Sequence, residues 1–444
     1  MFFSFEFWLG LGVFVIIYAF ASVRVQNILL LLSGLFFLYF YDTLSFWTWL
    51  FSIVLTLTGV RFFLQDKSDG KARLLICILI VALLTVQRLY LKNFIENPER
   101  VVGLSYFSLA MIGLILESYW KRPSSQLETF PLLVASSFFP IISMGPIEKL
   151  NAFQNQFKKR RIVSVNDLSL ACVNILFGFF KIFCVAAPLK LFINHSNPLT
   201  YSLAGVPLLL YCFFSFVQLY CEFSGYIAIV TGLSGVLGIK ITANFNNPYL
   251  ARNIRDLWKR WHISFVNWVR DYIYFPILMK TRNQIFTLFC VIFFVGSWHG
   301  LSFGYLYWSL YWSFLVGVYI LALRLSKYKL LGQIMKIKGL GIFATIIAMS
   351  LSNISFMAEV QGLGSTLSRT VRLNDYNFTY FWRDDLLTQA ELIFLYLSIC
   401  IVLFFEVEVR VYSTIKALVF SLIFLFLISV LGRFNGYEFI YMRL

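Results

Sequence analysis

The sequence is poor in charged residues and in histidine. Of its 444 residues, 13% are charged, 60% are hydrophobic and only three are His. Soluble domains carry about 25% charged residues, so this composition excludes an ordinary soluble protein and indicates an integral membrane protein. The net charge of +16 does not indicate a nucleic-acid partner, because the cations lie between apolar runs, where they set membrane topology.

Several motifs of metal-dependent and nucleotide-dependent enzymes are also missing. The seven cysteines form no C-x-x-C pair, which argues against a disulfide framework or a zinc knuckle. There is no glycine-rich phosphate loop, nucleophile elbow or H-E-x-x-H motif, and two histidines without a third nearby ligand argue against zinc. We therefore expect no metal and no permanently bound cofactor.

Long apolar runs dominate the chain instead. A spanning helix needs about 20 apolar residues, and we expect eleven or twelve spans. The candidates are 6–22, 27–41, 44–64, 73–91, 102–118, 168–188, 204–233, 283–299, 304–323, 339–358, 391–409 and 413–431. The first has no Lys or Arg before Arg24 and no small-residue cleavage site, so it is interpreted as a retained span.

One apolar segment does not fit a full crossing. Residues 131–147 are interrupted by Pro140, Gly145 and Pro146, which favours a re-entrant or interfacial segment. The predicted fold class is an all-α integral membrane protein with a multi-spanning helical bundle. We predict one membrane-embedded domain, with N-terminal spans in 1–122, a core with re-entrant and amphipathic segments in 123–323, and C-terminal spans in 324–444.

The cations predict an orientation in the membrane. Loops that face the cytoplasm carry an excess of Lys and Arg, and an N-terminus outside the cytoplasm satisfies this rule if 131–147 does not cross. The cytoplasmic segments then carry Arg24; Arg61, Lys67, Lys71 and Arg73; Lys121 and Arg122; Lys158 to Arg161; Arg252, Arg255, Lys259 and Arg260; and Arg324, Lys327, Lys329, Lys336 and Lys338.

Residues 240–282 are too polar to span and too aromatic for a solvated loop. Placed on a helix at roughly 100° per residue, 252–272 are amphipathic, which predicts a helix at or in the membrane interface. One face carries Ile254, Trp258, Trp261, Phe265, Trp268, Val269 and Tyr272, and another carries Arg252, Arg255, Lys259 and Arg270. His262 falls on the edge of the apolar face.

Two histidines lie in tryptophan-rich segments, where a group that titrates near neutral pH is costly to place. His299 follows Trp298 and precedes Gly300. It is either an interfacial residue at a helical hairpin near the outer surface, or a desolvated, neutral imidazole that accepts a proton. His262 is either an interfacial histidine beside lipid-binding cations, or part of a site for phosphates or an acidic carrier protein. His195 is given no role.

The order and spacing of several blocks resemble the membrane-bound O-acyltransferase (MBOAT) superfamily. The similar branch contains the membrane subunits of alginate O-acetylation and of teichoic-acid D-alanylation. The blocks are GLSYF at 103–107 with ESYWKR at 117–122, SFFP at 137–140, GPIE at 145–148, EFSGY at 222–226, NFNNPY at 244–249, the run 255–274, WHG at 298–300 and FIY at 439–441.

The resemblance implies a ring of helices around a funnel or tunnel and a transfer of an acyl group from a thioester to a hydroxyl. It implies that His299 is the main catalytic residue and that His262 is a second functional residue. The sequence departs from the family pattern at Glu222, where Asp is usual, at Ile227 and Ala228, and at 277–279. These departures bear on the substrate or donor and not on the histidines.

On this reading, the oxyanion formed during transfer needs hydrogen-bond donors. The candidates are His262, an indole N–H of Trp298 or Trp261, and a backbone N–H near Gly300. The further candidates for binding donor or substrate are Trp258, Arg252, Arg255, Lys259, Arg260, Glu222 and Asn246. The cationic face would dock acetyl-CoA phosphates or an acidic acyl carrier protein.

The preferred function is O-acetylation of a cell-envelope polysaccharide from the bacterial inner membrane, together with an extracytoplasmic acyltransferase partner. D-alanyl transfer to teichoic acid from a carrier-protein thioester is the near alternative. The alternatives of another class are a transporter or lipid-linked sugar flippase, which would use intramembrane charges, and a non-catalytic scaffold. Lys181 is one such charge, and the sequence shows no evident partner for it.

Overall fold

The computed structural model describes residues 5–64, 70–94, 103–121, 128–195, 204–326, 337–372, 389–408 and 414–433. Regular structure in these ranges is helical, without strands. The predicted cytoplasmic cations Lys67, Arg122, Lys327, Lys329 and Lys336 and the terminal block at 439–441 lie outside the described residues.

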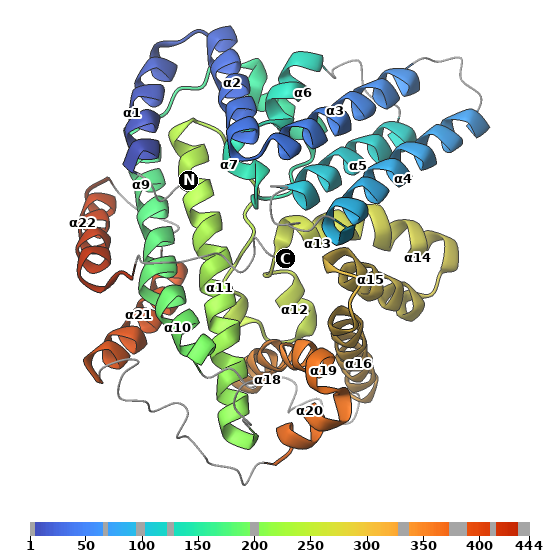
Figure 1. Ribbon diagram of the computed structural model, residues 1–444, viewed down its shortest axis with the longest axis vertical. Coiled ribbons are helices and arrows are strands. Elements are labelled where there is room, and N and C mark those ends of the chain that lie inside the picture. Colours follow the sequence, from blue (N-terminus) through green and yellow to red (C-terminus); the bar gives the residue numbers. More distant parts are fainter. Residues whose placement is uncertain are drawn as a thin grey trace.

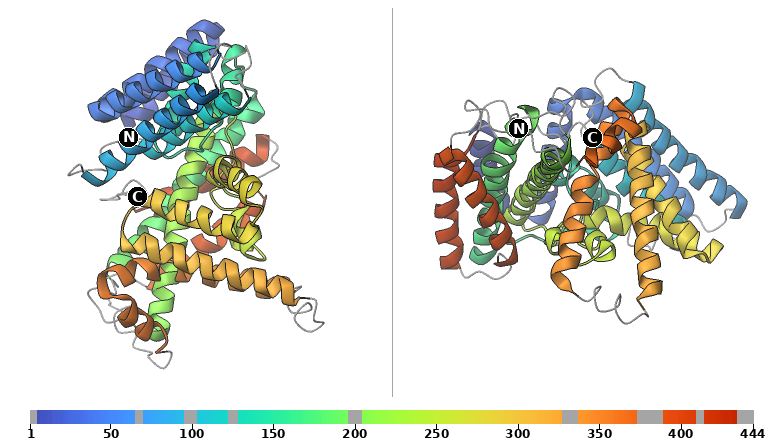
Figure 2. Two further views of the ribbon diagram at one scale, coloured as in Figure 1. Left: turned by 90° about the vertical axis from the view of Figure 1, so that its right-hand side faces the viewer. Right: turned by 90° about the horizontal axis from the view of Figure 1, so that it is seen from below.

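The N-terminal helices form one side of the molecule (Figure 1). They are α1 (Phe5–Phe20), α2 (Val23–Tyr41), α3 (Thr43–Leu64), α4 (Gly70–Phe94) and α5 (Leu104–Lys121). Helix α3 packs between α2, α4 and α5. In the right-hand view of Figure 2, α3 and α4 lie at one edge with α14 (Phe275–Thr281), and α21 (Gln389–Glu408) and α22 (Thr414–Leu431) lie at the opposite edge.

The predicted spans all fall on helices. Eight helical stretches within the described residues are long and apolar enough to cross a membrane. Four more are shorter apolar helices, at Glu6–Phe20, Leu104–Trp120, Gln284–His299 and Ile393–Leu403. The all-helical, multi-spanning class predicted from composition is therefore confirmed.

Two long helices pack face to face through the centre of Figure 1. They are α9 (Val165–Phe180), which continues through a π-helical turn, η3 (Lys181–Ala186), into α10 (Ala187–His195), and α11 (Gly205–Val236). Glycines bring the backbones together: a Cβ on Gly178 would lie 2.5 Å from the carbonyl oxygen of Gly225. Small residues allow this approach between membrane helices.

The structure supplies the partners of Lys181 that the sequence does not show. Its ammonium donates to the hydroxyl of Ser224 at 3.2 Å and lies 4.4 Å from the ring centre of Phe177. These partners come from another helix and from the preceding turn, so the local sequence does not reveal them. The charge is part of the packing between α9 and α11.

The segment 131–147 does not form a spanning helix. It contains α6 (Thr129–Ser136) and α7 (Phe139–Ile142), both buried, with a break at Ser137. The chain then runs through α8 (Leu150–Phe153) and the 3-10 turn η2 (Gln154–Lys158). Helices of eight and four residues are far too short to cross a bilayer, as the proline and glycine pattern indicated.

The prediction of one continuous amphipathic helix over 252–272 is wrong. The structure has α12 (Ile254–Trp258), a turn, α13 (Ile263–Val269) and a π-helical turn, η5 (Arg270–Tyr274), which leads into α14. The turn forms because the chain at 244–246 pairs with it: the amide of Asn246 donates to the carbonyl of Arg260 at 3.0 Å. These bonds replace the helical ones.

The remaining helices complete the bundle. Helix α15 (Gln284–His299) and α16 (Phe303–Leu325) form a hairpin, and α16 packs on α19 (Ile354–Gln361). Helix α18 (Lys338–Leu351) packs on α11, and α20 (Leu363–Thr370) follows α19.

Candidate active site

His262 lies in the tight turn between α12 and α13. Its φ of 45° is left-handed, a conformation that costs a residue other than glycine roughly 1–3 kcal/mol. Asn244, which is buried, holds the turn from both sides. Its carbonyl accepts from the amide of Ile263 at 2.9 Å, and its side-chain oxygen accepts from the amide of Ser264 at 3.0 Å. Surrounding contacts thus maintain the strained backbone.

The imidazole of His262 is enclosed by aromatic rings. The side chain is 6% exposed, and its ring centre lies 5.0 Å from Phe223, 5.1 Å from Phe265 and 6.3 Å from Tyr106. Burial, with a smaller contribution from the neighbouring His299, lowers the pKa of His262 to about 3. The ring is therefore neutral at physiological pH. Its Nδ1 has no hydrogen-bond partner within the described part of the chain.

His299 is the last residue of α15, at the hairpin with α16. Its half-buried ring contacts three aromatic rings: Phe265 at 5.9 Å, Tyr305 at 6.1 Å and Trp308 at 6.4 Å between ring centres. The hairpin considered from the sequence is thus present. The histidine in it is packed among aromatic side chains rather than fully exposed.

The fold brings the two histidines together although they are far apart in sequence. Both imidazoles contact the ring of Phe265, and His299 is close enough to lower the pKa of His262 electrostatically. One histidine is fully buried and neutral, and the other is partly accessible. This pairing is the central feature of the site.

The predicted tryptophans lie around the pair, in its second layer. Trp258 contacts Trp308, which in turn contacts His299. Trp261 is buried against Phe245 and the rings of α11. Trp298 is buried and packs on Phe294 at 6.1 Å.

The predicted cationic face is divided. Arg252, Arg255 and Lys259 are exposed. Arg260 instead turns toward the protein, pairs with Asp256 at 2.9 Å and donates to the carbonyl of Asn246 at 3.0 Å. Burial alone would raise the pKa of Asp256, but bonds and charge from the arginines outweigh it and lower that pKa. Three cations therefore remain free to dock a ligand, and Arg260 secures the turn.

Glu222 and Asn246 also support the turn from behind. Glu222 is fully buried in α11, and its carboxylate accepts a hydrogen bond from the side-chain amide of Gln218 at 2.6 Å. The next residue, Phe223, contacts His262 edge-on. The backbone amide of Asn246 donates to the carbonyl of Arg260, and the carbonyl of Asn246 accepts from the guanidinium of Arg260. The structure places both residues beside the histidine turn.

Sequence reasoning placed His262 at the edge of the face that carries Phe265, and these two rings are in contact. It missed the rings of Tyr106 and Phe223, which lie inside the blocks at 103–107 and 222–226, so the motifs were the available signal. Tyr305 lies outside the quoted blocks. Its contact with His299 arises from the hairpin, which residue spacing alone does not reveal.

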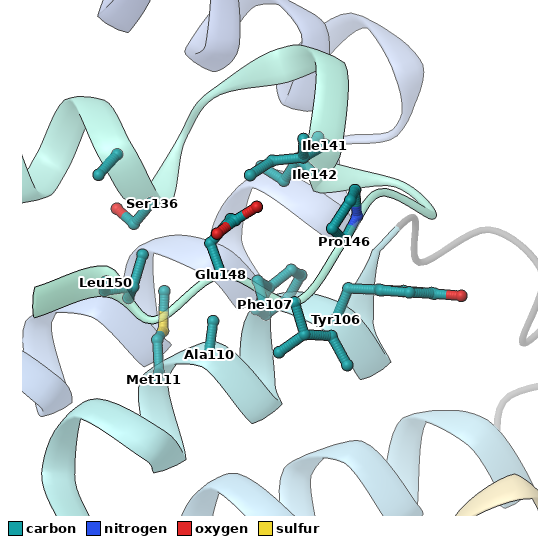
Figure 3. A pocket seen from close by; sticks show the side chains of 12 residues that line it. Tyr106, Phe107, Ala110, Met111, Ser136, Ile141, Ile142, Pro146, Glu148 and Leu150 are labelled. Carbon is teal, nitrogen blue, oxygen red and sulfur yellow. The ribbon is translucent and has the colours of Figure 1, made fainter. Parts of the chain in front are cut away.

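Two neighbouring cavities are lined by residues close to His262. A small one of about 30 Å³ is lined by Tyr106, Ser136, Ile142 and Glu148 among others, and the Glu148 carboxylate is seen in Figure 3. The ring of Tyr106 also stacks on His262.

A larger cavity of about 290 Å³ shares Ile147 and Glu148 with the first. Its remaining lining residues are Lys149, Ala152, Phe153, Gln156, Thr242, Ser264, Asn267 and Trp268. Its polar groups suit a ligand with amides or hydroxyls.

Glu148 lies where the two cavities meet. One carboxylate oxygen accepts from the amide of Thr242 at 2.5 Å, and the other accepts from its hydroxyl at 2.9 Å. Burial raises the pKa of Glu148, although these two bonds oppose the rise. The sequence analysis identified the block at 145–148, but it did not predict that the carboxylate of Glu148 lies between two cavities.

The part of the chain that the structure describes contains no group of three or more His, Cys, Asp or Glu residues that could hold a metal ion.

Comparison with known proteins places the site in a family. The profile described as the membrane-bound O-acyltransferase family matches residues 133–361, a range that includes both histidines. The chain is 27% identical over 290 residues to the teichoic acid D-alanyltransferase of Bacillus subtilis. The aligned residues cover 60% of this chain and 72% of that protein.

Two further relatives act on other polymers according to their names. The probable alginate O-acetylase AlgI of Pseudomonas fluorescens is 26% identical over 318 residues, which are 68% of this chain and 62% of that protein. The peptidoglycan O-acetyltransferase of Helicobacter pylori is 28% identical over 267 residues, 51% and 49% of the two chains. The chain thus spans only about half to three quarters of these relatives.

Proposed function

The chain belongs to the membrane-bound O-acyltransferase family, and from this premise we propose that it moves an acetyl group from a cytoplasmic thioester to a hydroxyl, for O-acetylation of a cell-envelope polysaccharide. The observation that carries the proposal is the pair of histidines on one aromatic ring, with His262 buried and neutral. The proposed location is the bacterial inner membrane, and the proposed partner is an extracytoplasmic acyltransferase.

In the proposed step, the acceptor oxygen attacks the thioester carbonyl while His299 takes the hydroxyl proton. The C–S bond then breaks, and the protonated imidazole returns the proton to the departing thiolate, so that the step is balanced. A neutral His262 keeps one ring N–H, which is able to stabilise the oxyanion. The aromatic shell limits water and so protects the thioester from hydrolysis.

The donor is proposed to approach from the side of the exposed cations. Arg252, Arg255 and Lys259 supply charge that suits acetyl-CoA phosphates or an acidic carrier protein. The 290 Å³ cavity has the polar lining that the amide-bearing arm of either thioester requires. Its shared wall with the smaller cavity supports a path from there to Tyr106 and His262.

The experiment uses membranes that contain the full chain, with labelled acetyl-CoA and, separately, a carrier loaded with labelled D-alanine. We expect acetyl transfer to fall about 100-fold or more in His299→Ala, since general base catalysis contributes 10²–10⁴-fold. His195→Ala is the matched histidine control.

D-alanyl transfer is retained as a second candidate because the Bacillus subtilis relative has that name and is covered over 72% of its length. If only the alanyl carrier gives labelling, and that labelling depends on His299, the transferred group is D-alanyl and not acetyl. The proposal would be overturned if neither donor gave His299-dependent labelling and solute transport survived in His299→Ala. That result would favour a transporter.

A further inference from the structure

The ring of Tyr305 covers the turn that carries His299. The two ring planes are nearly parallel, 17° apart, with centres 6.1 Å from each other. The same phenol ring packs on the backbone of Gly300: a Cβ at that position would lie 2.4 Å from Cε2 of Tyr305. The glycine of the Trp-His-Gly triplet therefore provides the space in which Tyr305 reaches the histidine.

Helix α19 holds the first turn of α16 on both sides of Tyr305. The ring of Phe356 meets the Tyr305 ring edge-on at 5.2 Å. The carboxylate of Glu359 accepts from the hydroxyl of Ser302 at 3.1 Å and lies against Gly304, where a Cβ would be 2.4 Å from the oxygen. A carboxylate at a helix N-terminus also interacts favourably with the helix dipole.

We propose that Tyr305 is a positioning residue for His299 and that Glu359, through the start of α16, is a positioning residue for Tyr305. The inference rests on the proposed function of His299 as the general base. His299 ends a helix at a hairpin and is half-buried, and the Tyr305 ring lies nearly parallel to its imidazole. Catalysis by an oriented base is sensitive to displacements of about 1 Å, which can cost about 100-fold in rate.

The first test compares Tyr305→Leu with Tyr305→Phe in membranes that contain the full chain, with whichever thioester supports His299-dependent transfer. We expect kcat to fall about 10-fold to 100-fold in the leucine variant with KM for the thioester unchanged, and the phenylalanine variant to recover most of the rate. Tyr307→Leu is the matched control, because Tyr307 stacks on Phe303 at 6.3 Å on the same helix.

The second test separates packing from positioning. Gly300→Ala forces a methyl group into the Tyr305 ring, so it lowers both the Tm and kcat. Adding Tyr305→Ala removes the clash and restores the Tm, but on our proposal kcat stays low because the Tyr305 ring no longer orients His299. Recovery of kcat in the double variant would overturn the proposal.

Glu359 is tested in the same way. Glu359→Ala loses the contact with Ser302 and is expected to lower kcat several-fold with KM unchanged, whereas Glu359→Gln keeps an acceptor oxygen and most of the rate. A full rate in Tyr305→Leu, with His299→Ala inactive, would contradict the inference and leave the proposed function intact. An active His299→Ala would contradict the proposed function itself.

Discussion

At the scale of single residues, His262 is the most constrained side chain of the site. It has a left-handed backbone, a buried ring and an Nδ1 without a partner in the described residues. Such a combination is unfavourable for stability and persists because surrounding packing enforces it. The role proposed for the neutral ring would account for this cost.

The pKa of His262 predicts a dependence of stability on pH. The folded pKa of about 3 lies below the ordinary histidine pKa of 6.5, so between these values the unfolded chain binds a proton that the folded chain does not. Stability is therefore expected to fall as the pH drops below 6.5, by at most about 1.4 kcal/mol per pH unit from this residue.

The measurement is thermal unfolding in detergent at pH 7.5 and 5.0, for the natural chain and for His262→Asn. Asparagine tolerates the left-handed backbone and does not titrate in this range. All other groups are common to both proteins, so the difference isolates His262. Equal losses of Tm on acidification in both proteins would show that the ring is solvated.

At the scale of secondary-structure elements, the glycines between α9 and α11 are expected to be critical. A Cβ on Gly178 would lie 2.5 Å from a backbone oxygen of α11 and 2.9 Å from the amide of Ile229. We expect Gly178→Ala to destabilise the protein by about 1–3 kcal/mol, the usual cost of overpacking.

Gly317→Ala is the matched control, because Gly317 lies inside helix α16 with no atom within 4 Å of its added Cβ. There alanine is expected to be neutral or to stabilise by up to about 1 kcal/mol, from its higher helix propensity. Thermal unfolding of both variants measures the contrast. A similar Tm in the two would mean that α9 and α11 do not pack as closely as the structure indicates.

The sequence predicted those helices that are specified by the residues within them. An apolar run of about 20 residues specifies a membrane helix wherever its neighbours lie, so the predicted spans fall on helices. The helix over 252–272 was wrong because its break depends on pairing of Arg260 and Ile263 with residues near 245. Periodicity within one segment contains no information about such partners.

In the candidate site, too, the sequence predicted the local features and not the contacts between distant segments. His262 and His299 stand out because histidine is rare in this chain, and the motif blocks gave them roles. The contact of His262 with Phe265 agrees with their spacing on one helical face, whereas the contacts of His299 with Phe265 and Tyr305 do not follow from spacing. The roles of both histidines, and the single domain over 1–444, stay predictions.

At the scale of the whole molecule, the proposed reaction requires that the exposed cations and the His299 hairpin face opposite sides of the membrane. The cation-rich loops predict that Lys259 faces the cytoplasm. Helix α15 then leads to the outer side, where Leu301 is 66% exposed at the hairpin. A cytoplasmic donor and an external acceptor would meet between these two positions.

Cysteine labelling in intact cells tests this arrangement. In a background where the exposed Cys172 and Cys400 are replaced by serine, we expect a membrane-impermeant maleimide to label Leu301→Cys directly and Lys259→Cys only after permeabilisation. The reverse pattern would place the cations outside, away from any cytoplasmic thioester. The path proposed from the cations through the polar cavity to His262 would then have no donor at its entrance.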